Sequence, residues 1–212
     1  MATPAFVLPA RVKGFHNYFE FTAETGVILA QLGYGFGRAM LTLPQSNVNG
    51  AAQWAEPLQK RILLTLQRVA MVAEATRREF LLAPILFDVS VAVDAELHSE
   101  YAVNVSPQLR GQLDFYLEKQ SALLVVEAKN ADMARGFTQL AAELIALDNF
   151  AAPEIPTLYG VVSVGDVWRF GVLDRARKHI TQDIRQFTLP DDLPELLSTL
   201  TGILANVPER KS

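Results

Sequence analysis

Hydrophobic residues along the chain change from helical spacing to short β-rich runs and back again. Residues 58–82 and 131–148 place apolar side chains every three to four positions, which predicts helices. Between and after these segments, shorter apolar and alternating runs predict strands at 95–103, 111–117, 123–129 and 157–163. The predicted order is helix, three strands, helix, strand, which indicates an α/β (α+β) fold with a mixed central sheet flanked by helices.

The segments outside this core have patterns of their own. Before the core, 15–21 and 38–43 predict strands and 24–32 predicts a short helix. We therefore expect residues 1–50 to form a small N-terminal accessory β-unit packed on the core, and residues 51–212 to form one compact unit.

After the core, residues 167–173 predict a second strand that forms a hairpin with 157–163 across a Gly-Asp turn. Trp168 and Phe170 alternate onto one side of this strand, and core packing is the favoured role for the pair over base stacking. Residues 189–207 predict a terminal helix with acidic residues in its first turn.

Composition narrows the functional classes. The chain has 212 residues, half of them hydrophobic, without the run of about 18 uncharged apolar residues that a membrane span needs. Its first 15 residues hold no sustained apolar segment, so secretion is not expected. Cysteine is absent, which excludes disulfides and thiolate metal sites and fits a reducing, cytoplasmic location. The three histidines are too scattered to predict a zinc site.

Net charge is −4 and the isoelectric point is about 5.4, whereas strong nucleic-acid binders tend to be basic. If the partner is a nucleic acid, we therefore expect weak and salt-dependent intrinsic affinity, or delivery by another protein.

Charged residues at the end of the 123–129 run carry the most specific chemical signal. Glu127 and Lys129 are two positions apart, so a strand places them on one face. A hairpin formed with the 111–117 strand brings Asp114 beside Glu127. Carboxylates in this arrangement are suitable ligands for Mg²⁺, which prefers oxygen donors and keeps several waters.

Asp114, twelve intervening residues and then Glu127-Ala128-Lys129 form a pattern that resembles the PD-(D/E)xK nuclease superfamily, which has the restriction-endonuclease-like fold. The resemblance implies an αβββαβ core over roughly residues 58–173. It also implies that Asp114, Glu127 and the backbone carbonyl of Ala128 hold Mg²⁺, with Mn²⁺ as a substitute. Lys129 would orient and deprotonate the attacking water. Leu113 stands where many members have proline.

The same resemblance suggests supporting residues. Members often place a glutamine or basic residue on the helix after the E-x-K strand, where Gln139 is the best match and Arg135 is a possible phosphate contact. Some branches carry a glutamate on the first core helix that reaches the metals, and Glu74 is preferred to Glu79 for that role. The alternative for all four is an ordinary solvated helix surface, including an i, i+4 pair between Glu74 and Arg78.

The pattern as a whole predicts a Mg²⁺-dependent endonuclease that hydrolyses phosphodiester bonds, with DNA as the expected partner and a homodimer as a possible assembly. One alternative is a non-catalytic module that keeps the fold for nucleic-acid binding or assembly. Another is an unrelated α+β sheet in which Glu127 and Lys129 form only a surface ion pair. DNA or RNA, duplex or single strand, and sequence specificity stay open.

Overall fold

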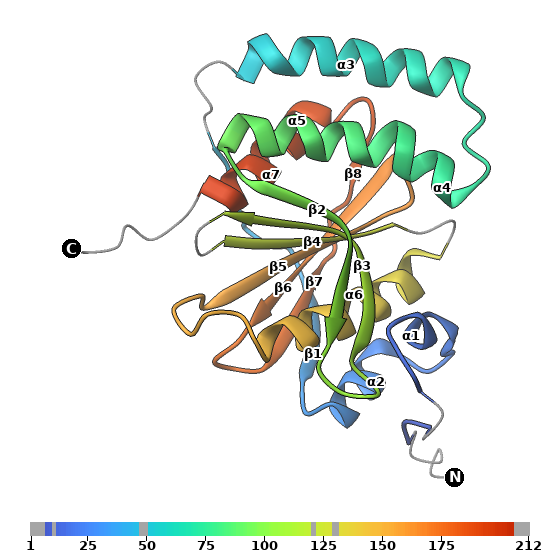
Figure 1. Ribbon diagram of the computed structural model, residues 1–212, viewed down its shortest axis with the longest axis vertical. Coiled ribbons are helices and arrows are strands. Elements are labelled where there is room, and N and C mark those ends of the chain that lie inside the picture. Colours follow the sequence, from blue (N-terminus) through green and yellow to red (C-terminus); the bar gives the residue numbers. More distant parts are fainter. Residues whose placement is uncertain (1–6, 10–11, 47–50, 120–121, 129–131, 206–212) are drawn as a thin grey trace.

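An eight-stranded mixed sheet forms the centre of the computed structural model, which describes residues 7–9, 12–46, 51–119, 122–128 and 132–205 (Figure 1). The strand order is β1-β7-β6-β5-β4-β3-β2, and the short β8 pairs with β6 outside this path. The strands are β1 (Gly35–Ala39), β2 (Glu96–Asn104), β3 (Arg110–Lys119), β4 (Ala122–Ala128), β5 (Thr157–Ser163), β6 (Val167–Asp174), β7 (His179–Asp183) and β8 (Phe187–Thr188).

Helices cover both faces of this sheet (Figure 1). They are α1 (His16–Glu20), α2 (Thr25–Gln31), α3 (Ala51–Arg68), α4 (Glu74–Arg77), the π-helical turn η1 (Arg78–Leu82), α5 (Ala83–Val93), α6 (Met133–Asp148) and α7 (Leu193–Ala205). Two hydrophobic cores result. One lies between the sheet and α1, α2 and α6, and the other between the sheet and α3, α5 and α7. Among the described residues, no helix is both long and apolar enough to cross a membrane.

The predicted order of core elements is confirmed. Strands β2, β3 and β4 form consecutive antiparallel pairs, and β5 then lies parallel to β4. A parallel neighbour requires a crossover connection, and α6 supplies it across one face of the sheet. The predicted hairpin of β5 and β6 is also present, and Trp168 and Phe170 are both fully buried in the core.

The single helix predicted over residues 58–82 is wrong. Helix α3 ends at Arg68, the chain turns, and α4, η1 and α5 continue to Val93. Apolar residues in the turn, such as Val69 and Val72, continue the helical spacing, so the pattern conceals the reversal. Pro84 does not end the helix; it lies at the start of α5, where the π-helical turn η1 passes into the α-helix.

The N-terminal segment differs from the predicted β-unit. Residues 15–21, expected as a strand, contain helix α1 instead, because Phe15 and Tyr18 are both buried at i, i+3 spacing beside α6. Among the described residues of this segment, β1 is the only strand, and it begins at Gly35 rather than at residue 38. It pairs in parallel with β7, so this segment extends the same sheet as the core.

Candidate functional site

The carboxyl end of β4 places Glu127 inside the protein, where its side chain is only 1 % exposed. Strand β4 lies between antiparallel β3 and parallel β5, and its pairing ends at Ala128, opposite Ser163. Val126 points into the core that contains α5 and α7, so Glu127 points to the opposite face, towards α6. The sheet therefore directs this carboxylate against a buried helix.

Helix α6 supplies the partner of Glu127. Gln139 donates from Nε2 to Glu127 Oε1 at 2.7 Å and to Glu143 Oε1 at 3.0 Å. The structure thus brings Gln139 to Glu127, as predicted, and adds Glu143, which is fully buried. One neutral amide joins the two carboxylates.

Glu143 was not among the predicted site residues, although the sequence holds a signal for it. Residues 136–147 are almost entirely apolar, and the structure buries every one of them. Gln139 and Glu143 lie four residues apart within this segment, so they are adjacent on a helix without a solvated face. A carboxylate inside such a helix needs polar partners, because unpaired buried charges are costly.

Two buried carboxylates that share one neutral amide favour a positive charge near them, because burial in a medium of low dielectric strengthens their repulsion. A divalent cation or an ammonium group would provide that charge. Lys129, the predicted ammonium, lies outside the described residues.

Strand β3 is twisted at Asp114, so that the residues before and after it pack against opposite faces of the sheet. The β3–β4 pairs from Lys119–Ala122 to Phe115–Val126 follow one register, and continuing it by one residue would set Asp114 opposite Glu127. Leu113 packs in the core on the α6 side, whereas Phe115 packs in the core on the α5 side. The neighbouring β2 is distorted at the same level, since Glu100 has a positive φ of 53°. Asp114 thus occupies a twisted part of the sheet, with 19 % of its side chain exposed.

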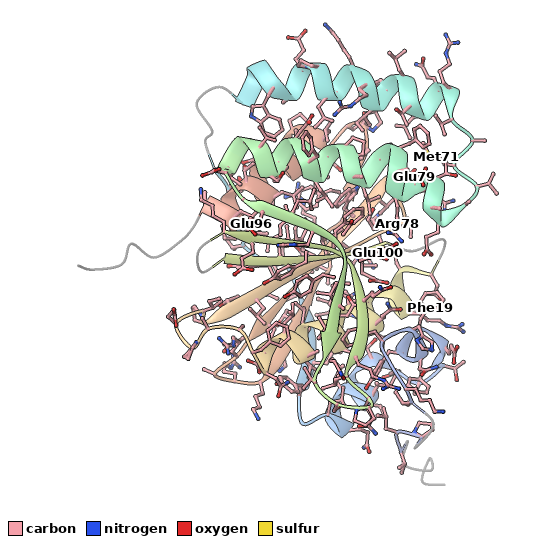
Figure 2. The ribbon with its side chains drawn as sticks, viewed as in Figure 1. Phe19, Met71, Arg78, Glu79, Glu96 and Glu100 are labelled. Atoms are coloured by element: carbon pink, nitrogen blue, oxygen red, sulfur yellow. The ribbon has the colours of Figure 1, made fainter. Side chains whose placement is uncertain are left out.

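Arg78 reaches this twisted region from η1, and sequence reasoning missed that contact. Its Nη1 lies 3.3 Å from Asp114 Oδ1 and its Nη2 lies 3.4 Å from Glu100 Oε1. The guanidinium also stacks over the Phe115 ring at 5.6 Å. Figure 2 shows Arg78 and Glu100 together at the bend of β2. Arg78 therefore pairs with two carboxylates of the sheet, Asp114 and Glu100, and not with Glu74, the i, i+4 partner that helical spacing suggested.

The structure places the remaining predicted residues on helices α4 and α6 and on the turn η1. Glu74 is the first residue of α4 and is partly buried, whereas Glu79 is exposed. Arg135, in the first turn of α6, is 3.3 Å from the N-cap residue Asp132 and lines an open groove of about 760 Å³ that Arg38 of β1 also lines. A groove with two arginines is compatible with the predicted phosphate contact of Arg135.

The residues present fit a Mg²⁺ site in part. Mg²⁺ usually takes one or two protein carboxylates and completes its octahedron with waters, which Asp114 and Glu127 could provide with the carbonyl of Ala128. Within the part of the chain that the structure describes, however, no three acidic, histidine or cysteine side chains gather in a geometry for holding a metal ion.

No family model, curated protein or solved structure matches the chain. The fold and the placement of these side chains are thus the observations from which a function can be proposed.

Proposed function

We propose that the protein is a Mg²⁺-dependent nuclease of the PD-(D/E)xK type that hydrolyses phosphodiester bonds in DNA. The observation that carries this proposal is the β3–β4 register, which pairs Phe115 with Val126 and so leaves Asp114 and Glu127 as the next residues of two neighbouring strands, together with the 2.7 Å hydrogen bond from Gln139 to Glu127. The order of elements, with α6 crossing between parallel β4 and β5, agrees with the αβββαβ core that the resemblance implies.

Each residue has a distinct role in this proposal. Asp114 and Glu127 bind the metal, and Gln139 orients the Glu127 carboxylate. Bound Mg²⁺ would supply neutralisation of phosphate charge and a water of lowered pKa. Lys129, two residues after Glu127, would orient that water, and its positive charge would favour loss of the water's proton. Glu74 would support the site from α4.

The test is a cleavage assay with plasmid and single-stranded DNA in Mg²⁺ or Mn²⁺. Wild type should cut in a metal-dependent manner, whereas Asp114→Asn and Glu127→Gln should not. Asp88→Asn is the matched control, because Asp88 is a carboxylate on α5 that pairs with Arg61 at 2.8 Å. Unchanged cleavage in Asp114→Asn, or no cleavage by wild type in either metal, would contradict the proposal.

A non-catalytic binding or assembly module is the second candidate, and Arg78 is the observation that favours it. The Arg78 guanidinium lies 3.3 Å from Asp114. It therefore occupies a position next to this carboxylate that the metal ion would take in a nuclease. If this pair is permanent, Mn²⁺ should not bind, and Arg78→Ala should create binding that wild type lacks.

A further inference from the structure

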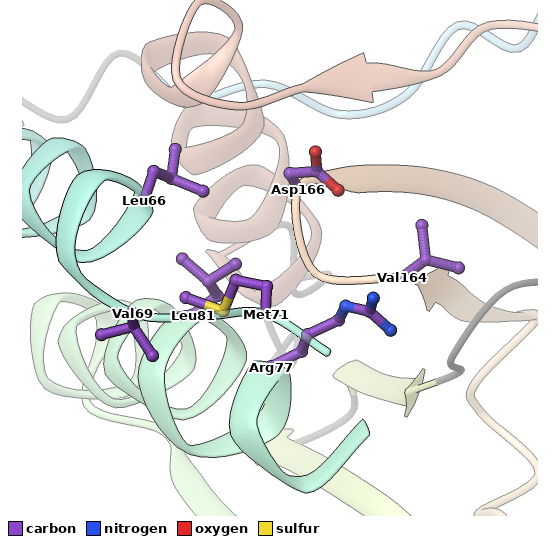
Figure 3. A pocket seen from close by; sticks show the side chains of 7 residues that line it. All are labelled: Leu66, Val69, Met71, Arg77, Leu81, Val164 and Asp166. Carbon is purple, nitrogen blue, oxygen red and sulfur yellow. The ribbon is translucent and has the colours of Figure 1, made fainter. Parts of the chain in front are cut away.

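A cavity of about 320 Å³ lies between helices α3 and α4 and the turn that joins β5 to β6 (Figure 3). Five of its seven lining residues are apolar, and two charged side chains, Arg77 and Asp166, complete the lining. The apolar residues are Leu66, Val69, Met71, Leu81 and Val164. The volume is at the lower end of the range of about 300–1,000 Å³ that small-molecule sites occupy.

Both walls of the cavity adjoin the candidate site along the chain. Arg77 directly precedes Arg78, whose guanidinium lies 3.3 Å from Asp114. Val164 directly follows Ser163, the β5 residue that pairs with Ala128 at the end of β4. Neighbouring Cα atoms are about 3.8 Å apart and neighbouring strands about 4.8 Å apart. Two cavity residues are therefore chain neighbours of residues at the candidate site, and a ligand in the cavity would lie near the same end of the β4–β5 pair.

The lining combines two kinds of contact. Leucine, valine and methionine side chains would pack against the faces of a flat apolar ring. An arginine only donates hydrogen bonds and a carboxylate only accepts them, so the edge of the ring must offer both acceptors and donors. A nucleobase has this chemistry, and guanine matches it best because O6 and N7 suit arginine while its N–H groups suit a carboxylate.

The turn on one side of the cavity is held in place by its own contacts. Gly165 has a positive φ of 103°, and a Cβ at this position would lie 2.9 Å from Arg77 Cδ. The Gly165 carbonyl accepts a 2.9 Å hydrogen bond from Trp168 Nε1 in the core, and the Gly165 N–H donates to Ser163 Oγ at 3.0 Å. Asp166 is therefore attached to a turn that is held in place, which is the preorganisation that selective recognition needs.

We propose that this cavity binds one unstacked nucleobase, with guanine preferred, next to the scissile phosphate of the DNA substrate. This inference rests on the proposed nuclease function, because it assigns the neighbouring nucleotide of the same strand. It implies a substrate with unpaired bases, since a base within a duplex cannot enter such a pocket without leaving the stack.

The first experiment measures base insertion without cleavage. A single-stranded oligonucleotide with one 2-aminopurine is titrated with protein in Ca²⁺, and its fluorescence reports unstacking. Wild type should raise the fluorescence. Leu66→Trp, which fills the cavity, should abolish the rise, whereas Leu64→Trp should not, because Leu64 is 56 % exposed on the same helix. Thermal unfolding shows whether each variant is folded.

The second experiment measures base preference, and it remains informative if Leu66→Trp does not fold. Wild type should favour guanine over thymine next to the cut by about tenfold, and Asp166→Asn should remove most of that preference. Leu66→Trp should raise KM for single-stranded DNA about tenfold or more, with a smaller change in kcat.

The outcomes separate this inference from the proposed function. Cleavage with no base preference and with normal KM in Leu66→Trp would overturn the pocket assignment and leave the nuclease intact. A fluorescence rise that Leu66→Trp abolishes, in a protein that cuts no DNA, would support the pocket and overturn the nuclease. No fluorescence change with wild type would overturn the pocket assignment whatever the cleavage assay shows.

Discussion

Two arginine–aspartate pairs in this protein have the same chemistry and different surroundings. At the end of α6, Arg175 Nε donates to Asp148 Oδ1 at 2.6 Å, and its other nitrogens donate to the carbonyls of four residues. Those carbonyls belong to Asp148, Ala151, Ala152 and Ile155. At the bend of β2, Arg78 shares its guanidinium between Asp114 and Glu100 at 3.3 and 3.4 Å.

This difference in surroundings indicates that the Arg175–Asp148 pair is structural, whereas the Arg78–Asp114 pair is replaceable. Arg175 donates to the carbonyl of Asp148, the last residue of α6, and to three carbonyls of the loop that follows, so its loss would leave several acceptors without this donor at once. Arg78 makes two longer ion pairs at a partly exposed position, where each contributes little stability. A metal ion could take the place of Arg78 beside Asp114, whereas nothing could readily take the place of Arg175.

The largest expected effect is on activity. Replacement of Glu127 with Gln keeps the shape of the side chain and removes its charge. The cleavage rate should fall about a thousandfold or more, because several kcal/mol of metal-dependent stabilisation of the transition state is lost. Single-turnover cleavage at saturating Mg²⁺ measures this. Far-UV circular dichroism should match wild type, and a fall in activity caused by unfolding would instead point to a structural role.

Replacement of Arg175 with Ala should have the largest effect on stability. Both partners of this ion pair are mostly buried, with 15 % and 12 % of their side chains exposed, and loss of one leaves the other charge uncompensated. We expect the free energy of unfolding to fall by about 3–5 kcal/mol, measured by urea denaturation. The cleavage activity of the protein that remains folded should not change. A loss of cleavage without unfolding would contradict the assignment of a purely structural role to Arg175.

Replacement of Glu143 with Gln should weaken metal binding. Glu143 accepts from the same amide that positions Glu127, and loss of such outer contacts typically costs about 10- to 100-fold in metal affinity. Calorimetric titration with Mn²⁺ measures the change. An affinity equal to that of wild type would show that Glu143 only fills space in the buried face of α6.

Replacement of Arg78 with Ala should change stability by less than about 1 kcal/mol, because its ion pairs are partly exposed. Metal affinity should rise, since the guanidinium no longer competes for Asp114. Urea denaturation and Mn²⁺ titration of the same preparation measure both quantities. A loss of stability as large as that of Arg175→Ala would show that the two pairs are equivalent.

The smallest expected effect concerns Arg185 and Glu195, a third pair that lies on the surface. Hydrogen bonds from Arg185 hold the pKa of Glu195 below its ordinary value of 4.5. A lowered folded-state pKa stabilises the protein above pH 4.5, and this contribution is lost as the pH falls through the folded-state value. Solvent screening limits it to about 0.5 kcal/mol. Urea denaturation at pH 7 and at pH 3 should show a smaller difference for Arg185→Ala than for wild type, and equal differences would contradict the assignment.

The sequence was sufficient to predict those parts of the fold that depend on local patterns. Strands β2 to β5 and helix α6 follow from alternation and helical spacing, and the hairpin spacing predicts that Asp114 comes beside Glu127. Gln139 was predicted from the resemblance to the nuclease superfamily, and the structure places it in hydrogen-bond contact with Glu127 because α6 crosses the sheet after β4.

The errors have a common physical origin in contacts between distant segments. The reversal between α3 and α4 occurs within an apolar run, so no polar residue marks it. Helix α1 depends on burial of Phe15 and Tyr18 beside α6. The parallel pairing of β1 with β7 brings together segments that are about 140 residues apart in the sequence. Likewise, the contact between Arg78 and Asp114 depends on where η1 passes over β3.

The central claim is that Asp114 and Glu127 form one metal site. Its most direct test is a Mn²⁺ titration followed by electron paramagnetic resonance, with wild type, Asp114→Asn, Glu127→Gln and the control Asp88→Asn. The account predicts one specific ion per chain in wild type and in the control, and none in the other two variants. Binding that survives both substitutions, or no specific binding in wild type, would contradict it.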